Sequence, residues 1–465
     1  DEVHYHPAYH ELMRLAVRHG VHNIAWTRQG EGGHVAHVAA LYLLTQPEQG
    51  VCCPITMTHA VVPALRLEPA LADFWEPKIR AREYDPRCLP ASEKAGVTFG
   101  MAMTEKQGGS DVRANTTRAQ ALGGDEYELT GHKWFCSAPM SDAFLTLAQT
   151  PAGLTCFLVP RWRPDGTRNP FFIQRLKDKL GNRANASAEI EYCNTWARRL
   201  GEEGRGVRAI IEMVHQTRLD AATAPVGMMR QAWVQALHHA RHRSAFGKPL
   251  SEQPLMRYLL ADLALELEAE VALVLRIARS FDHAEKDPEE RLLGRVGTAV
   301  AKYWTNKRAP QFIYEAMECL GGNGYVEESI LPRLYREAPV NSIWEGSGNV
   351  ICLDVLRAME REPQTIPAFL WEVESARGGH RRLDAAIVRL KQEFAKREQA
   401  EARARRITEL MALTLQASLL VRHAPAVVAH AFCESRLGES AGLLYGTLAP
   451  EVGVDAILER AWGAD

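Results

Sequence analysis

The sequence lacks the long apolar run and the strong net charge that mark several classes of protein. No stretch approaches the roughly 20 apolar residues that are needed to cross a bilayer. The first residues, Asp1 to His10, also lack the basic and then apolar order of a signal peptide, so we expect a cytoplasmic protein with no membrane partner. With 55 basic and 57 acidic residues the formal net charge is -2, which excludes a chain that is basic throughout.

Cysteine is sparse, and two common glycine motifs are absent. The nine cysteines are odd in number and scattered, with no Cys-x-x-Cys pair, so they indicate neither a disulfide framework nor a zinc site. We interpret them as mostly buried thiols, and we expect no metal. No glycine cluster matches a Walker loop, and none follows a strand as Gly-x-Gly-x-x-Gly, so neither a P-loop nucleotidase nor a Rossmann dehydrogenase is supported.

Length and apolar periodicity divide the chain into four parts. A chain of 465 residues with 46% hydrophobic content is long enough for about three domains. Apolar residues recur at helical spacing over residues 1–98, which predicts an N-terminal helical domain. Short apolar runs separated by glycine and proline turns predict a β domain over residues 99–206.

Helical periodicity then returns and predicts a bundle over residues 207–362. Pro363 and Pro367 indicate a linker, and a further helical extension is expected over residues 363–465. The predicted fold class is therefore α+β and multidomain. Because the chain begins at Asp1 within helical sequence rather than at a methionine, we expect a natural N-terminal segment to precede it.

Seven motifs in one order resemble those of the acyl-CoA dehydrogenases. Met101–Asp111 resembles the Thr-Glu-x-x-x-Gly-Ser-Asp signature that opens the β domain of that family. Six further matches follow in the family's order: Gly131–Ser137, Leu180–Arg183, Leu200–Gly206, Arg243–Pro249, Met317–Tyr325 and Ile343–Gly348. Together they cover about residues 99 to 360.

The resemblance implies a helical domain, a β domain and a helical bundle that hold FAD, in a homotetramer built as a dimer of dimers. It places a first group of residues at the flavin ring, its ribityl chain and its phosphates: Met101, Met103, Thr104, Gly109, Ser110, Phe135 and Ser137. A second group would serve the pyrophosphate and adenine or complete the FAD site: Arg243, Phe246, Gly321, Gly322, Gly324, Trp344, Gly346, Ser347 and Asn349. Arginine and amide-rich glycine turns suit phosphates and flat rings.

Glu345 is the candidate for proton chemistry. In much of the family, the glutamate at this place removes the α-proton of an acyl-CoA while a hydride leaves for the flavin, which requires a carboxylate of raised basicity. The alternative is an acid that only favours the start of the next helix, which Ser347 or Asn349 could cap. Phe135, Ser137 and Ala245 depart from the family's usual Trp, Thr and Gln, so we expect any dehydrogenation to be weak.

The residues of several motifs most resemble those of a branch of the family that is linked to the adaptive response to DNA alkylation. That branch is described as having weak isovaleryl-CoA dehydrogenase activity, double-stranded DNA binding and a C-terminal helical extension. From Arg377 to Arg406 this chain has ten basic residues against four acids. Leu383, Ile387, Leu390 and Phe394 recur at helical spacing in the same segment, so an apolar stripe can dock while a basic face contacts phosphates without reading bases.

The candidate DNA-binding residues are Arg357, Arg381, Arg382, Arg389, Lys396 and Arg397. Arg357 matches a position implicated in DNA binding in that branch, and its alternative is a surface or ion-paired arginine. The alternative for the basic segment as a whole is a solvated helix face. Two functions therefore stay open: an FAD-binding protein of the DNA-alkylation branch, or a metabolic short or branched-chain acyl-CoA dehydrogenase with no role on DNA.

Overall fold

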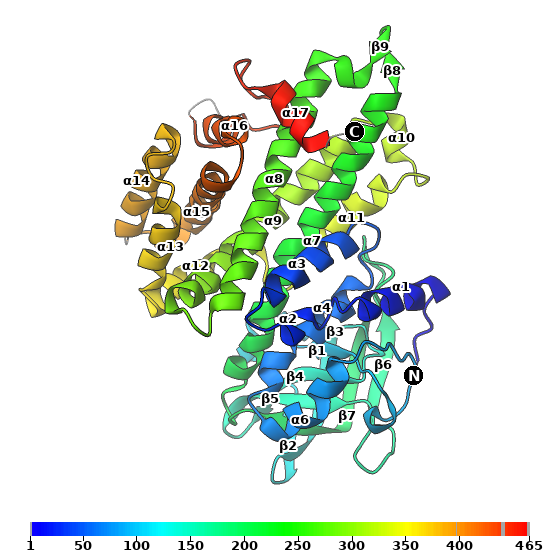
Figure 1. The fold of residues 1–465 in the computed structure, drawn as a ribbon. Helices are drawn as coiled ribbons and strands as arrows, with labels where there is room; N and C mark the ends of the chain where they lie inside the picture. The colour runs from blue at the N-terminus through cyan, green and yellow to red at the C-terminus, as the bar shows by residue number, and fades with distance from the viewer. Residues whose placement is uncertain (1, 397, 439–441, 463–465) are drawn as a thin grey trace. The chain divides into compact units, whose positions relative to one another are not determined.

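A computed structural model describes residues 2–396, 398–438 and 442–462. The chain forms two compact units, one made of Asp1–Leu44 and Glu48–Asp220, the other of Thr45–Pro47 and Ala221–Asp465. Within the described residues, no helix is long and apolar enough to cross a membrane. The predicted fold class is confirmed, because helices precede a β region and further helices follow it (Figure 1).

The first unit begins with short helices. These are α1 (Pro7–Arg18), α2 (Ile24–Thr27), α3 (Gly33–Leu44), α4 (Cys52–Ala60), α5 (Val62–Leu65) and α6 (Pro69–Ile79). α1 starts where the sequence favours a start, because Pro7 needs no hydrogen-bond partner for its nitrogen and the His6 side chain accepts the amide proton of Ala8. Met13 of α1 and Leu41 of α3 pack in one apolar cluster with Val51 and Ile55.

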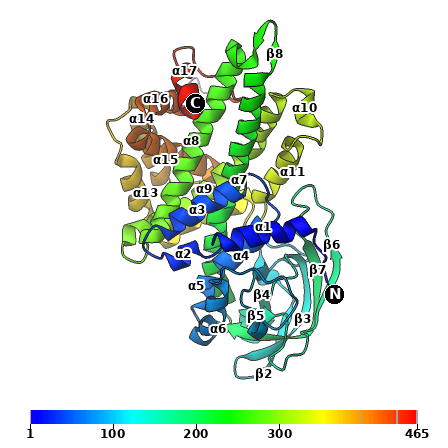
Figure 2. The ribbon, with the colours of Figure 1, turned by 45° about the vertical axis from the view of Figure 1, so that its right-hand side comes forward.

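Seven strands follow, and their pairing closes the sheet on itself. They are β1 (Phe99–Ala102), β2 (Arg118–Gly123), β3 (Glu126–Ser137), β4 (Ala143–Thr150), β5 (Gly153–Pro160), β6 (Phe171–Leu176) and β7 (Ser187–Leu200). The pairs β4–β2, β2–β3, β3–β7, β7–β5 and β5–β4 return to the starting strand, which makes a barrel with β1 and β6 attached (Figure 2). Phe144, Phe157 and Tyr192 fill its core.

Long helices make up most of the second unit. α7 (Gly206–His242) runs on into it, and a hairpin of β8 (Ser244–Ala245) and β9 (Lys248–Pro249) follows. The bundle then contains α8 (Pro254–His283), α9 (Pro288–Glu318), α10 (Gly322–Tyr325), α11 (Leu331–Asn341) and α12 (Gly348–Arg361). α8 and α9 pack along each other, and α9 also contacts α11 and α12.

The C-terminal extension packs on this bundle through buried charges. It contains α13 (Thr365–Glu374), α14 (Arg381–Ala395), α15 (Ala400–His423), α16 (Ala426–Leu437) and α17 (Val454–Trp462). Glu372 of α13 pairs with Arg276 of α8 at 2.7 Å. Arg436 of α16 reaches Asp262 at 2.5 Å and Glu266 at 3.0 Å, both on α8.

The basic segment differs from the sequence prediction in one respect. α14 buries Leu383, Ile387 and Leu390, as the apolar stripe predicts. The helix ends at Ala395, however, and Gln399 adopts a left-handed φ of 51° before α15 begins, so the basic residues that the structure describes lie on two helices and their flanking turns. The interpretation of the cysteines as mostly buried thiols is confirmed: all nine lie in the described residues and none forms a disulfide, Cys88 is half-buried, Cys193 is exposed and the others are buried.

Candidate functional site

The loop after β1 holds the first group of predicted flavin contacts. Met101 lies in β1, and Met103 and Thr104 follow it, half-buried. The amide of Trp134 donates to the Thr104 carbonyl at 2.7 Å, and the Asn115 side chain donates to the Met103 carbonyl at 3.0 Å. The loop backbone is therefore fixed against β3.

Gly109 and Ser110 complete this loop and are exposed. A side chain at position 109 would clash with the Thr104 hydroxyl, so only glycine lets the loop fold back over Thr104. No neighbouring atom lies where a Cβ of Gly108 would stand, so the backbone there remains open. Such a cradle fits the flat ring and phosphates of FAD.

A buried ion pair anchors this loop to β3. The Lys133 ammonium lies 2.8 Å from the Glu105 carboxylate, and both side chains are fully buried. Thr116 and Thr117 also donate to Glu105, through backbone and hydroxyl groups. Burial alone would raise the pKa of Glu105, but the adjacent ammonium outweighs it and holds the pKa below its usual range. Both residues lie inside matched motifs, yet spacing alone did not reveal their pairing.

Phe135 and Ser137 lie on β3 with the buried Cys136 between them. Phe135 is 48% exposed, so its ring is free to lie against a ligand. The Lys177 ammonium lies 3.2 Å from the ring centre of Trp134 and 4.9 Å from that of Phe135. The Ser137 hydroxyl is 3.3 Å from that of Ser187. The register of β3 against β7 shifts between Lys133 and Cys136, and within this irregular stretch Phe135 is exposed while those two residues are buried.

In the second unit, the β8–β9 hairpin carries Arg243 and Phe246. Leu250 donates its amide to the Arg243 carbonyl at 2.8 Å, which closes the hairpin. Phe246 has a left-handed φ of 54° and is 98% exposed. Among the residues that the structure describes, no acid pairs with the Arg243 guanidinium, which suits it to a pyrophosphate.

The glycine turn after α9 has one open side and one tight side. At Gly321 and Gly322, an added Cβ would meet nothing within 4 Å, so the peptide groups stay accessible. At Gly324, a Cβ would collide with the Met317 carbonyl, so this glycine permits the turn itself. The two open glycines match the predicted role of a backbone surface for a phosphate or a ring.

The turn before α12 presents the candidate base. Glu345 has a left-handed φ of 59°, a strained conformation for any residue with a side chain. The ammonium of Lys302, which is buried in α9, donates to the Gly346 carbonyl at 2.6 Å and so fixes the next peptide. Trp344 and Glu345 are half-buried.

The helix after this turn starts without help from a side chain. α12 starts at Gly348 with Ser347 at the N-cap position, but Ser347 makes no capping bond through its side chain. Asn349 is exposed and lies inside the helix. No acid lies in the first turn of α12, and Glu345 lies two residues before its N-cap, so the alternative of an acid that favours the helix start stays open.

Acidic side chains accompany most cations of the basic segment. Glu434 of α16 lies 3.5 Å from Arg381 and 3.2 Å from Arg382. Lys391 and Arg377 reach Glu374. Glu393 lies within 4 Å of three cations: Lys396, Arg403 and Arg406.

Several of these cations nevertheless stay in water. The side chains of Arg381 and Arg406 are 79% and 77% exposed. Arg389 donates to the Leu437 carbonyl at 3.4 Å, and Arg397 lies outside the described residues. Arg357 is half exposed and 3.8 Å from Asp354, so the alternative of a loosely ion-paired surface arginine remains open.

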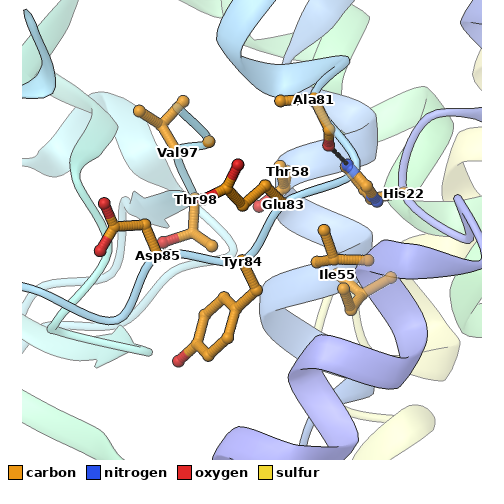
Figure 3. Close-up of a pocket in the computed structure, with 11 residues that line it drawn as sticks. His22, Ile55, Thr58, Ala81, Glu83, Tyr84, Asp85, Val97 and Thr98 are labelled. Carbon is orange, nitrogen blue, oxygen red and sulfur yellow. Dashed lines mark hydrogen bonds between the residues drawn. The ribbon is translucent and has the colours of Figure 1, made fainter. Parts of the chain in front are cut away.

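A small pocket in the first unit is a poor candidate for a substrate site (Figure 3). His22, Tyr84 and Asp85 line it, and the His22 ring is 3.0 Å from the Ala81 carbonyl. Its volume is about 10 Å³, the space of roughly one water molecule. Burial lowers the pKa of His22 to about 4.

Three family models match this chain. The Adaptive response protein AidB N-terminal domain matches residues 1–86. The acyl-CoA dehydrogenase middle domain matches residues 100–195, and the acyl-CoA dehydrogenase C-terminal domain matches residues 204–360.

Individual proteins show the same likeness. The chain is 45% identical over 465 residues to AidB from Escherichia coli (strain K12), covering 100% of this chain and 85% of that protein. It is 30% identical to Caenorhabditis elegans ACDH-11, solved in complex with C11-CoA, with a TM-score of 0.87 over 94% of this chain and 81% of that one. Butyryl-CoA dehydrogenase from Megasphaera elsdenii is 23% identical, with a TM-score of 0.65 over 77% of this chain and 91% of that one, a likeness of fold.

Proposed function

We propose, from the premise that this chain belongs to the acyl-CoA dehydrogenase family of FAD-dependent oxidoreductases, that it slowly oxidises a short branched acyl-CoA such as isovaleryl-CoA. The observation that carries the proposal is the strained turn at Glu345, held through Gly346 by the buried Lys302. Strain of this kind persists only where the surrounding structure maintains it, and it clusters at functional sites.

Each residue group has a separate task. FAD, when bound, supplies the acceptor for the hydride that leaves the β-carbon of the acyl chain. The Glu345 carboxylate takes the α-proton, and the remaining electron pair forms the Cα–Cβ double bond. The loop of Thr104 and Ser110, with Phe135, holds and orients the flavin, while Arg243 neutralises pyrophosphate charge.

The base can be tested by substitution. Glu345→Gln removes the proton acceptor while keeping its shape, so isovaleryl-CoA oxidation should fall at least about 100-fold, with FAD retained. Anaerobic bleaching of the flavin absorbance measures the oxidation, and the absorbance spectrum before mixing measures bound FAD. Glu328→Gln, an exposed glutamate of the same unit, is the matched control. Unchanged bleaching in the Glu345 variant would exclude this residue as the base.

We also propose that the C-terminal extension binds double-stranded DNA without sequence preference, in the response to DNA alkylation. The support is the set of exposed cations on α14, α15 and their flanking turns, above all Arg381 and Arg406. Their partners, Glu434 and Glu393, are each shared by several cations and are mostly buried. The contacts of Arg381 and Arg406 are long, at 3.5 and 4.0 Å, and both guanidinium groups are exposed, so these two pairs contribute little stability. Phosphates can therefore replace those acids at low cost, and Arg357 is a further candidate contact on α12.

Salt dependence tests this proposal. Phosphate contacts release counterions, so duplex affinity should fall steeply between about 50 and 200 mM salt. Arg381→Gln combined with Arg406→Gln should weaken binding and reduce the salt slope by about two, while Arg14→Gln, on the exposed face of α1, should change neither. A flat salt response in a fluorescence anisotropy titration refutes the phosphate contacts.

A metabolic dehydrogenase without a DNA role is the second candidate, and the bound acyl-CoA of the relative ACDH-11 favours it. Rapid flavin bleaching with no duplex binding supports it.

For both functions we propose a homotetramer. The Phe246 ring on the β8–β9 hairpin is almost fully exposed, and a second copy of the chain would cover it.

A further inference from the structure

A second basic hollow lies in the first unit, at the start of α7. Its volume is about 390 Å³, within the roughly 300 to 1,000 Å³ of small-molecule sites. Three arginines line it: Arg113 from the short 3-10 turn Val112–Ala114, Arg205 from the turn just before α7, and Arg208 from the first turn of α7. Leu154 and Val207 add apolar walls. None of these residues has a role in the proposed oxidation.

The three guanidinium groups are poorly neutralised. Among the described residues, no acid lies within ion-pair distance of Arg113 or Arg208, and Arg208 interacts with Glu212, one turn further along α7, only at longer range. Arg205 has one partner, Glu202 at 3.1 Å, and both side chains of that pair are more than half exposed. An exposed pair of this kind is largely screened by water, so the hollow keeps an excess of positive charge.

The position of these charges is unfavourable for α7 itself. A helix N-terminus carries a partial positive charge, and the first turn of α7 contains no acid while Arg205 and Arg208 lie beside its start. Glu202 and Glu203 precede the helix, and Glu202 is already paired with Arg205. A bound anion would add negative charge at this helix start.

The walls of the hollow are held in place by the barrel. The Gly204 amide donates to the Thr155 hydroxyl at 2.8 Å. A Cβ on Gly206 would come within 2.5 Å of the backbone of β5, so α7 begins in direct contact with that strand. On the other side, the Gln149 side chain donates to the Arg113 carbonyl at 3.1 Å. The arginines therefore extend from fixed backbone.

We propose that this hollow binds the phosphate group of a small phosphate monoester. Guanidinium groups match phosphate oxygens with paired hydrogen bonds, and the partial positive charge of a helix start favours the same anion. The volume exceeds that of a lone phosphate, so the organic part of the ligand lies against Leu154 and Val207. Free phosphate and the 3′-phosphate of coenzyme A share this chemistry.

Calorimetric titration of the full-length holoprotein with inorganic phosphate tests the site. We expect saturable binding that weakens about tenfold in Arg205→Gln and in Arg208→Gln, the loss of one charged hydrogen bond. Arg18→Gln, at the exposed end of α1, should bind as the unchanged protein does. Thermal unfolding shows whether each variant is folded, and Arg208→Gln should be at least as stable as the parent because it removes a cation from the first turn of α7.

Coenzyme A and dephospho-coenzyme A then identify the source of the phosphate. If Arg208→Gln weakens coenzyme A but not dephospho-coenzyme A, the site takes the 3′-phosphate. If Arg208→Gln weakens the binding of inorganic phosphate but of neither form of coenzyme A, the site takes free phosphate. Absence of saturable phosphate binding, or equal binding by all variants, overturns the proposal. Because no arm measures flavin bleaching, failure here is distinct from failure of the proposed oxidation.

Discussion

The buried side chain of His22 makes the stability of the folded protein depend on pH. Its folded pKa is lowered to about 4 by burial, against 6.5 for an exposed histidine. Between these values the unfolded chain binds more protons, so stability is fully present above pH 6.5 and is lost as the pH falls toward 4. A shift of this size corresponds to about 3 kcal/mol.

His22→Gln should therefore flatten the pH dependence of stability between pH 6.5 and 4. Urea denaturation at a series of pH values measures the effect, and His4→Gln, at an exposed histidine, serves as the control. Equal slopes in the two variants would contradict the assignment. The sequence could not reveal this burial, because the pocket around His22 forms from segments as distant as Tyr84 and Val97.

At the scale of elements, the pair of Glu105 and Lys133 joins the loop after β1 to β3. Removing one partner leaves the other buried and uncompensated, so Lys133→Met should lower the free energy of unfolding by about 3–5 kcal/mol. The double variant Glu105→Leu with Lys133→Met should recover part of that loss. Chemical denaturation measures both, and a double variant less stable than Lys133→Met alone would show that the pair does not act as a unit.

Patterns within a segment predicted elements well, whereas partnerships between segments were not predictable. The spacing of Leu383, Ile387 and Leu390 predicted α14 because a buried stripe has local periodicity. The break before Gln399 carries no glycine or proline, so nothing in the sequence indicated it. The candidate flavin loop was found through its motif, but its buried support depends on strand register, which periodicity does not specify.

In the second unit as a whole, two buried charge networks join the C-terminal extension to the bundle, one around Arg276 and Glu372 and one around Asp262 and Arg436. Arg436→Met leaves Asp262 without its cation, and the unfolding free energy should fall by about 3–5 kcal/mol. Arg460→Met provides a matched control, because it removes a half-exposed arginine of α17 that pairs with Glu268, which lies on α8 as Asp262 does. That control should cost less than about 1 kcal/mol, and thermal unfolding compares the two. Equal losses would show that burial of the network is unimportant.

The basic segment shows why local charge counts mislead at this scale. Counting residues 377 to 406 gives an excess of bases, but Glu374 and Glu434 lie outside that window and pair with cations inside it. Only folding brings α16 beside α14, so the net field at this surface is weaker than the sequence count indicates.

Because the chain is synthesised from its N-terminus, the Asp262–Arg436 pair can form only late in synthesis. Asp262 leaves the ribosome 174 residues before its partner, which at about 5–20 residues per second is roughly 10 to 35 seconds. During that interval α8 carries a carboxylate whose cation does not yet exist, so the bundle cannot reach its final packing. The last quarter of the polypeptide therefore acts as the closing step of folding for helices made long before it.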